Sequence, residues 1–247
     1  MTRCRADVLL VRRGVFESRA RAQAAIAAGL VTADGAPILR PSDLVGADAA
    51  LAAEAPHPYV SRGGVKLAAA LDGFGLSPAG LACLDLGAST GGFTDVLLRR
   101  GAARVYAVDV GRGQLHAGLR ADPRVTAFEG LDARALEAAH VPEAVGLVVA
   151  DLSFISARLV LPHALGFAGP GAGLVLLVKP QFEAGRGAAV KGVVRDEAVH
   201  RTVCDGLARF VEQLGWSILG LIPSPIAGGD GNREFLLGAR RGEAARG

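Results

Sequence analysis

The chain has 247 residues, of which 51% are hydrophobic and 21% charged, and its formal net charge is +3. This composition is typical of a soluble globular protein, and the length allows one large domain or a small domain beside a mid-sized one. The near-neutral charge balance does not by itself indicate a nucleic-acid partner, so the distribution of charge along the chain matters more.

Cysteine and hydropathy patterns exclude several classes of protein. The three cysteines lie far apart, which argues against a disulfide framework or a zinc site and predicts a reducing, cytoplasmic location. The five histidines show no ligand spacing, so we expect no metal. Region 144–178 is the most apolar, but charged residues and prolines interrupt it, so it cannot supply the roughly 20 apolar residues of a membrane span. The apolar run near residue 8 is too short for a signal peptide.

The N-terminal 21 residues are basic, with six arginines against two acids. Such a block predicts an anionic partner at this end of the chain, although a solvated, arginine-rich helix face would have the same composition. A helix is expected from Ser18 as N-cap to Gly29, followed by two short strands around an Asp34-Gly35 turn. Arg19 and Arg21 fall in the first helical turn, where the helix dipole disfavours cations, and a phosphate bound from outside would account for them.

Residues 56–62 contain proline and precede a glycine pair, which indicates a linker before a second domain. From there short apolar runs alternate with helical stretches, which predicts an α/β fold with a mostly parallel sheet covered by helices on both faces. The runs are LACLDLG, RVYAVDV, RVTAFEG, VGLVVADLS, AGLVLLVK, WSILGLI and REFLLGAR. Ligands bind at the carboxyl ends of such strands, where the closing polar residues would line one crevice. Those residues are Asp85, Asp109, Asp132, Asp151 and Lys179.

The first of these strands leads into a glycine-rich turn, DLGASTGGFTD, at residues 85–95. The turn lacks the G-x-G-x-x-G spacing that cradles a pyrophosphate. Asp109 follows Asp85 by 24 residues, about the distance at which a carboxylate binds ribose hydroxyls. A nucleoside ligand without phosphates, such as S-adenosylmethionine, fits this combination, with Asp132 accepting from the adenine amino group. The alternative is a tight turn followed by two strand-end caps.

The residues that could take part in methyl transfer favour an oxygen acceptor. The segment ADLSFIS lacks the prolines typical of base amino methyltransferases, and Cys83 and Cys204 fall in a strand and mid-helix, where they are better interpreted as core residues than as nucleophiles. An oxygen acceptor must be aligned with the methyl group and must lose a proton.

Lysine is rare in this chain, and two of its three lysines fall beside carboxylates in the expected crevice. Lys179 closes the fifth strand run and Lys66 opens the first helix of the second domain. Unlike a guanidinium, an ammonium group can lose its proton in a suitable environment, so lysine suits a catalytic base. We therefore group Lys66, Asp151, Lys179 and Glu234 as a candidate catalytic set. Two ordinary ion pairs, Lys66–Glu234 and Asp151–Lys179, are the alternative.

These motifs in combination resemble a known family. RADVLLVRRGVFESRARAQAAIAAGLVTADG resembles an S4-type RNA-binding domain over roughly residues 3–52, and YVSRGGVKL, LDLGASTGGFTDVLL, YAVDVG, ADLSFIS, LLVKPQFE, KGVVRD and GNREFLL resemble the FtsJ-like ribose 2′-O-methyltransferases. Together they are similar to the TlyA family of ribosomal RNA methyltransferases, whose other name is hemolysin A. The resemblance implies a Rossmann-like S-adenosylmethionine-dependent methyltransferase sheet with a small N-terminal α+β RNA-binding domain.

The resemblance also implies an activity and a set of site residues. The activity is transfer of a methyl group from S-adenosylmethionine to a cytidine 2′-hydroxyl in ribosomal RNA, with Lys66, Asp151, Lys179 and Glu234 as the catalytic residues. The expected cofactor residues are Asp85, Gly87, Ala88, Ser89, Thr90, Gly91, Gly92, Phe93, Asp109 and Asp132. The expected phosphate contacts are Arg5, Arg19 and Arg21.

The expected domains are residues 1–55 for RNA binding, a linker at 56–62 and the methyltransferase at 63–240, with a tail at 241–247 for which we expect no ordered structure. The expected partners are ribosomal RNA or ribosomal subunits, with no membrane, and a monomer is favoured. Two other classes stay open. A membrane-lytic protein is suggested by the family's second name, although no strongly amphipathic cationic helix is evident. A catalytically idle RNA-binding module is the other.

Overall fold

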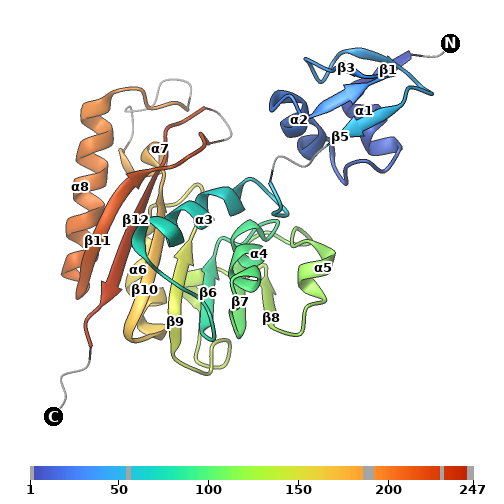
Figure 1. The fold of residues 1–247 in the computed structure, drawn as a ribbon. Helices are drawn as coiled ribbons and strands as arrows, with labels where there is room; N and C mark the ends of the chain where they lie inside the picture. The colour runs from blue at the N-terminus through green and yellow to red at the C-terminus, as the bar shows by residue number, and fades with distance from the viewer. Residues whose placement is uncertain (1–2, 54–56, 186–191, 229–230, 244–247) are drawn as a thin grey trace. The chain divides into compact units, whose positions relative to one another are not determined.

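The computed structural model describes residues 3–53, 57–185, 192–228 and 231–243. The chain divides into two compact units, Met1–Pro58 and Tyr59–Gly247. Figure 1 shows the helices and strands of both units, coloured in order along the chain.

The N-terminal unit is a small α+β fold whose two helices pack beside short antiparallel strands. Its elements are β1 (Arg3–Arg5), α1 (Ala6–Arg12), α2 (Arg19–Ala27), β2 (Val31–Ala33), β3 (Ala36–Pro37), β4 (Leu44–Gly46) and β5 (Leu51–Ala53). Strand β1 pairs with β4, and β2 lies between β3 and β5. Leu9, Leu10 and Ile26 form the centre of its core.

The local predictions for this unit are confirmed. Ser18 is the N-cap of α2, and its side chain accepts a hydrogen bond from Arg21 N at 3.3 Å. The turn between β2 and β3 places both Asp34 and Gly35 at positive φ, as a tight two-residue hairpin requires. Strands β1, β4 and β5 were not predicted, because three-residue strands carry too little alternation to stand out.

The larger unit is built on a seven-stranded sheet, and all seven predicted strands are present. They are β6 (Ala82–Leu86), β7 (Arg104–Asp109), β8 (Val125–Glu129), β9 (Val145–Ala150), β10 (Ala168–Val178), β11 (Trp216–Pro223) and β12 (Phe235–Arg241). The order across the sheet is β11-β12-β10-β9-β6-β7-β8. Strands β6 to β10 run parallel, whereas β12 is antiparallel to both β10 and β11.

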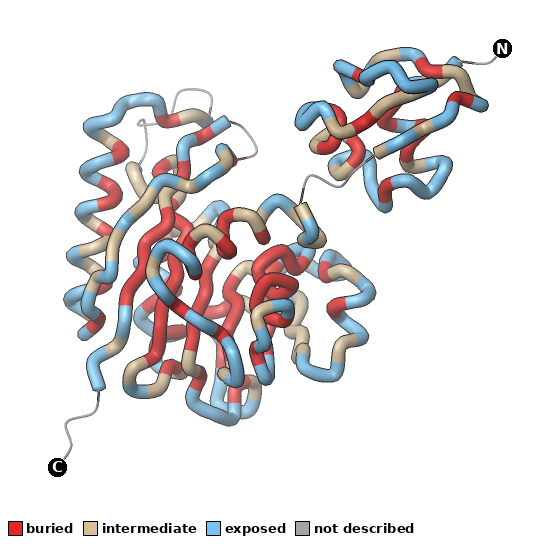
Figure 2. Tube along the Cα trace, viewed as in Figure 1, coloured by how far each residue is buried: buried red, intermediate tan, exposed pale blue. Residues whose placement is uncertain are grey.

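Helices cover both faces of this sheet, as the alternating pattern predicts. They are α3 (Gly63–Phe74), α4 (Gly92–Arg99), α5 (Ala117–Arg120), α6 (Ala157–Ala164), α7 (Pro180–Glu183) and α8 (Glu197–Gln213), with short 3₁₀ turns at Ala133–Ala135 and Leu165–Phe167. Helices α3 and α4 pack on one face, and α6 and α8 on the other. The central strands are buried between these two layers (Figure 2).

The sheet brings the ends of several strands to one edge. The parallel strands β6, β7, β9 and β10 end there, and the antiparallel β12 begins there. Of the predicted tail, residues 244–247 lie outside the described residues, and Arg241 belongs to β12. Among the described helices, none is both long and apolar enough to cross a membrane. The described residues also contain no group of three or more metal-ligating side chains.

Gly238 of β12 provides a test of how tightly the sheet packs against α3. A Cβ at this position would lie 2.5 Å from Phe74 Cγ, so the two elements pack closely only because residue 238 is glycine. We expect Gly238→Ala to lower the free energy of unfolding by about 1–3 kcal/mol, the usual effect of overpacking. Urea denaturation followed by fluorescence of Trp216, the single tryptophan, measures it. Gly242→Ala is the control, since a Cβ there would meet nothing within 4 Å. Equal losses in the two variants would contradict the prediction.

Candidate active site

Two adjoining cavities lie at the strand-end edge of the larger unit. They measure about 230 and 410 Å³ and share Gly87, Ser89 and Asp151 as lining residues. The smaller cavity is bordered by the start of α3 and the turn that follows β6, and the larger by the segments that follow β7, β8 and β9. Together they have the size of a site for a small organic ligand.

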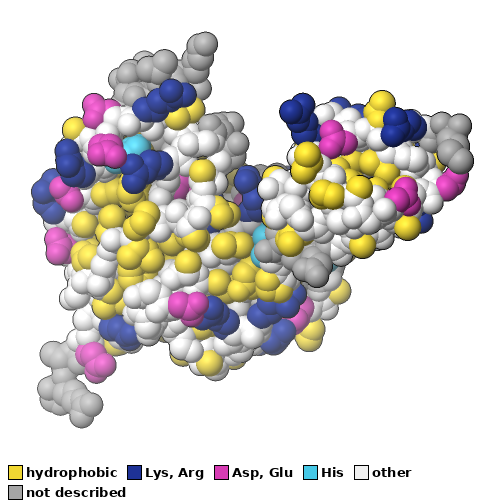
Figure 3. All heavy atoms as spheres, turned by 45° about the horizontal axis from the view of Figure 1, so that its top comes forward, with side chains coloured by type: hydrophobic (Ala, Val, Ile, Leu, Met, Phe, Trp, Pro, Cys, Tyr) yellow, Lys and Arg dark blue, Asp and Glu magenta, His cyan; other side chains and the backbone are white. Residues whose placement is uncertain are grey.

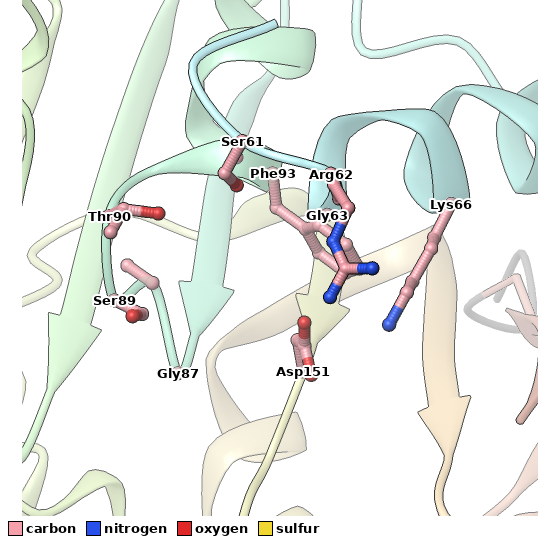
Figure 4. A pocket seen from close by; sticks show the side chains of 11 residues that line it. Ser61, Arg62, Gly63, Lys66, Gly87, Ser89, Thr90, Phe93 and Asp151 are labelled. Atoms are coloured by element: carbon pink, nitrogen blue, oxygen red, sulfur yellow. The ribbon is translucent and has the colours of Figure 1, made fainter. Parts of the chain in front are cut away.

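The turn between β6 and α4 forms the wall between the two cavities. Gly87 has φ +80°, and a Cβ there would lie 2.5 Å from the backbone oxygen of Asp151. Gly91 has φ +96°, and Gly92 packs against the start of α3 near Gly63 and Gly64. These glycines let the backbone pass close to β9 and α3 and leave the smaller cavity open (Figure 4).

Asp109 lies at the end of β7 on the wall of the larger cavity. Its Oδ2 accepts a hydrogen bond from Ser89 N at 2.8 Å, and its Oδ1 accepts one from Gly111 N at 2.7 Å. Ser89 Oγ in turn donates to Gln114 Oε1 at 3.0 Å. These bonds fix the carboxylate, and each oxygen keeps further acceptor capacity for a hydroxyl group of a ligand.

Asp132 also lines the larger cavity, but Arg134 already engages its carboxylate. The Arg134 guanidinium donates to both Asp132 oxygens, and Arg134 N donates to Oδ1, so the pKa of Asp132 falls to about 2. Apolar side chains from Val110, Leu131 and Ile155 surround the same space. The cavity therefore combines an apolar lining with acceptor groups, as a nucleoside base and its ribose require. The adenine contact predicted for Asp132 stays a prediction.

Asp85 is fully buried below the glycine-rich turn and lines neither cavity. Thr94 Oγ1 donates to its Oδ2 at 2.6 Å, whereas Oδ1 has no hydrogen-bond partner among the described residues. Burial, opposed by the Thr94 hydrogen bond and reinforced by Asp151, raises the pKa of Asp85 to about 7. Its predicted role in cofactor binding stays a prediction, and its described contact is to the first turn of α4.

Asp151 and Lys179 follow the neighbouring parallel strands β9 and β10, and their side chains meet at the edge of the sheet. Lys179 Nζ lies 2.6 Å from Asp151 Oδ1 and donates to Ser153 Oγ at 2.7 Å. The side chains are only 11% and 22% exposed, so the pair is largely shielded from water. The Phe182 ring lies 5.9 Å from the same Nζ.

Lys66 and Glu234 form a second ion pair, which is more deeply buried. Lys66 Nζ donates to Glu234 Oε2, and both residues are less than one-tenth exposed. A Cβ on Gly228 would lie 2.5 Å from Glu234 Oε1, so the preceding loop packs directly on this carboxylate. Lys66 and Asp151 line the same cavity, into which Arg62 and Lys66 extend from the start of α3 (Figure 4).

Sequence reasoning missed two residues beside Asp151. Ser153 fixes the Lys179 amine, and Phe154 lines the larger cavity with 91% of its surface exposed. Phe154 also has φ +64°, a strained backbone conformation for a bulky residue, and its ring lies 5.1 Å from that of Phe182. Both residues lie in the segment ADLSFIS, from which the sequence analysis took only Asp151 as a site residue.

The two core cysteines of this unit lie where the sequence predicted. Cys83 lies in β6 and Cys204 in α8, both buried, and burial raises the pKa of their thiols to about 12 and about 11. Neither lines the two cavities at the strand ends. A thiol held protonated in the core cannot serve as a nucleophile.

The three arginines predicted to contact RNA do not share one arrangement. Arg5 and Arg19 both donate to the buried carboxylate of Asp7. Arg21 instead lies 3.6 Å from Glu17, and its side chain is 23% exposed. Figure 3 shows Lys and Arg side chains on the surfaces of both units.

Comparison with known proteins identifies both units. The family model for FtsJ-like methyltransferases matches residues 59–241, and the model for the S4 domain matches residues 4–51. The 16S/23S rRNA (cytidine-2′-O)-methyltransferase TlyA of Mycobacterium tuberculosis is 48% identical over 96% of this chain and 90% of its own length. The chain belongs to the FtsJ-like methyltransferase family, in its TlyA group. It is a methyltransferase whose cofactor is S-adenosylmethionine.

Two further relatives carry the family's second name. Hemolysin A of Brachyspira hyodysenteriae is 36% identical over 94% of this chain and 98% of its own. A solved structure of a candidate hemolysin from Streptococcus thermophilus is 41% identical, covers 99% of this chain and 90% of that chain, and has a TM-score of 0.77. The predicted FtsJ-like methyltransferase with an S4-type domain is therefore confirmed, whereas the roles of individual site residues stay predictions.

Asp85 predicts an uncommon pH dependence of stability for the cofactor-free protein. Because its pKa in the folded state is raised to about 7, the folded protein retains between about pH 4 and 7 a proton that the unfolded chain releases. The free energy of unfolding should therefore fall as pH rises through this range. We expect a loss between pH 5 and pH 8 that is larger in the wild type than in Asp85→Asn, by on the order of 1–3 kcal/mol.

Urea denaturation at the two pH values, followed through Trp216 fluorescence, measures this difference. Asp205→Asn is the control, because Asp205 is exposed on α8 and undergoes the same chemical change. That control should keep the wild-type pH dependence. An Asp85→Asn profile parallel to that of the wild type would mean that Asp85 is ionised in the folded protein throughout the range.

Proposed function

We propose that this protein methylates the 2′-hydroxyl of a cytidine in ribosomal RNA, with Lys66, Asp151, Lys179 and Glu234 as its catalytic residues. The observation that carries the proposal is the Lys179–Asp151 pair at the ends of neighbouring strands, of which Asp151 lines both cavities beside the glycine-rich turn. Lys179 itself is not among the residues that line either cavity. The names of the Mycobacterium tuberculosis relative and of the S4 domain support the ribosomal substrate. The expected place of action is the cytoplasm.

When bound, S-adenosylmethionine supplies an electrophilic methyl group for in-line displacement by the acceptor oxygen. The larger cavity suits the adenosine part, with Asp109 toward the ribose hydroxyls and Val110, Leu131 and Ile155 around the base. The smaller cavity, bordered by Lys66 and Asp151, then receives the acceptor ribose. Gly87, Ser89 and Asp151 line both cavities, so the two parts of the proposed site adjoin at these residues.

The four charged residues position the acceptor hydroxyl and take up its proton. Asp151 and Ser153 hold Lys179 Nζ in one position, so that its remaining hydrogen-bonding direction is available to a ribose oxygen. Two proton routes fit this geometry. In the first, Lys179 releases its own proton to solvent and Nζ then accepts the hydroxyl proton. In the second, Lys179 stays charged and holds the oxygen while Asp151 accepts the proton. Glu234 neutralises Lys66, so the set carries no net charge before RNA binds.

Phe154 is suited to bind the base of the target nucleotide. A side chain that is 91% exposed and held at positive φ gains little from packing in the free protein, and such strain is concentrated at functional sites. Unstacked RNA bases are commonly bound by stacking on aromatic side chains. Phe154 follows Ser153, which contacts Lys179, and this links base binding to the position of the catalytic amine.

Membrane lysis is the alternative function suggested by the hemolysin relatives.

A methylation assay tests the proposal directly. The enzyme is incubated with methyl-labelled S-adenosylmethionine and either separated ribosomal subunits or naked ribosomal RNA, and the product is located by ribose-methylation mapping. A 2′-O-methylcytidine that appears only with the enzyme supports it. Methylation confined to a base, or lysis of erythrocytes by purified protein without S-adenosylmethionine, would contradict it.

Lys179→Ala should reduce methyl transfer by at least about 100-fold, the lower range for loss of a general acid or base. Its affinity for S-adenosylmethionine should stay within a few-fold, because the residues around the larger cavity are unchanged. Lys179→Arg should be equally inactive if the amine accepts the proton, since a guanidinium stays charged. Single-turnover assays and calorimetry measure the two quantities. Arg104→Ala, at the opposite end of β7, is the control. Equal loss of cofactor binding and transfer in Lys179→Ala would contradict the catalytic role.

Phe154→Ala should weaken transfer mainly through the RNA, because 91% of Phe154 is exposed, and since Phe154 also lines the larger cavity, affinity for S-adenosylmethionine is measured in the same variant. We expect a loss of 1–3 kcal/mol in RNA transition-state stabilisation, roughly 5- to 150-fold in kcat/KM, as for a lost base–aromatic stack. Phe154→Tyr, which keeps an aromatic ring, should retain most of the activity. Leu219→Ala, another exposed apolar residue but on β11, controls for the loss of apolar surface. An unchanged kcat/KM for RNA in Phe154→Ala would exclude a stacking role.

A further inference from the structure

A buried carboxylate lies beneath two arginines on the surface of the N-terminal unit. Asp7, in the first turn of α1, has a fully buried side chain. Arg5 donates from Nε to Oδ1 at 3.0 Å and from Nη2 to Oδ2 at 3.2 Å. Arg19 donates to Oδ2 from Nε at 3.2 Å and from Nη2 at 2.7 Å, and Gln23 Nε2 donates to the same oxygen at 2.8 Å. Asp7 thus joins the strand before α1 to the start of α2.

The two guanidinium groups keep donors for an external acceptor. Each uses two of its five N–H groups on Asp7, and no other partner is described for either. Their side chains are 46% and 57% exposed, whereas Asp7 is inaccessible to water. Since both place an Nη2 atom on the same Asp7 oxygen, the two positive groups are neighbours, and the cluster has a net charge of +1.

The cluster is built more firmly than an exposed ion pair. The hydrogen bonds from Arg5, Arg19 and Gln23 hold the pKa of Asp7 well below its usual range despite its burial, so the carboxylate stays ionised. A long arginine side chain loses rotamer freedom when it binds a phosphate, and a guanidinium already fixed by a carboxylate has less to lose. Arg21, by contrast, lies near Glu17 at 3.6 Å and takes no part in the cluster.

We propose that Asp7 is a positioning residue for RNA binding, which holds Arg5 and Arg19 side by side so that their free N–H groups bind adjacent phosphates of the RNA backbone. This inference rests on the proposed function, because it takes RNA as the partner of the N-terminal unit. Asp7 itself is buried and touches no RNA. It acts through the two arginines, whose paired guanidinium groups match phosphate oxygens in geometry as well as in charge.

The substitution Asp7→Asn separates positioning from simple electrostatics, because the two predict opposite signs. Removing a negative charge makes the protein more basic, so electrostatics alone predicts tighter binding to RNA. If Asp7 positions the arginines, the full-length variant should bind 16S and 23S rRNA transcripts about tenfold more weakly. The slope of log affinity against log salt should also become shallower by about one, the loss of one phosphate contact. Asp48→Asn is the control: the same change at an exposed turn of the same unit should leave affinity unchanged or raise it.

A double-substitution cycle distinguishes positioning from a general weakening of the fold. Arg19→Lys should weaken RNA binding in the wild type, but much less in the Asp7→Asn protein, where Arg19 is no longer held. Additive effects would indicate two independent defects and would overturn the proposal. If Asp7→Asn loses the circular-dichroism signal or melting transition of the folded unit, Arg5→Lys and Arg19→Lys, with Asp7 intact, replace it as the test. They keep the charge but lose the paired geometry, and wild-type affinity in both would overturn the proposal.

The outcome also separates this inference from the proposed function. If the wild-type protein fails to bind or methylate ribosomal RNA, the proposed function itself is contradicted. Wild-type protein that binds RNA, together with Asp7→Asn protein that binds as tightly or more tightly with an unchanged salt slope, would overturn only the role of Asp7. In each case affinity for S-adenosylmethionine should equal that of the wild type, because the cofactor cavities lie in the other unit.

Discussion

The parallel pairing of β9 with β10 is the constraint on which the active site depends. Their register aligns Leu176 with Ala150, so that both strands finish at the same edge and the polar residues that follow, Asp151 and Lys179, come within 2.6 Å. The strands themselves are buried and apolar, so the first charged residue after each one has to reach the edge of the sheet. There the two opposite charges satisfy one another in a shielded position, and in the proposed mechanism the same pair acts on the acceptor hydroxyl. The pairing that packs the core of the sheet therefore also fixes the positions of Asp151 and Lys179.

Much of this architecture could be predicted from the sequence, because it depends on strong local signals. Seven apolar runs gave seven strands, and the Ser18 cap and the Asp34-Gly35 turn formed as expected. The features that sequence reasoning missed depend on tertiary contacts. Asp85 follows the strand pattern of a ligand residue, but its side chain points below the turn toward Thr94. Phe154 looks like an ordinary core residue in the sequence, but it has a positive φ and is 91% exposed, and no local pattern indicates either property.

Pairing partners of charged residues were the least predictable feature. Asp7 is close to Arg5 in sequence, but its pairing with Arg19 and Gln23 requires α1 and α2 to pack together. Lys66 and Glu234 are an exception, because the sequence analysis had already named them as a possible ion pair, and they meet where α3 lies over the sheet. Charge counts can indicate that a segment is basic. They cannot tell which arginines remain available to a partner and which ones are fixed by a neighbouring acid, because that depends on the fold.

Strand β12 is antiparallel to its neighbours, and this has a consequence for biosynthesis. Its direction lets Glu234, just before the strand, reach the edge where the parallel strands end. Three members of the candidate catalytic set are translated earlier, yet Lys66 has no carboxylate partner other than Glu234 among the described residues. In a nascent chain that still lacks β12, the Lys66 amine has no counterion and the edge of β10 that pairs with β12 is unpaired. The proposed catalytic arrangement can therefore form only after β12 has been translated and has paired with β10.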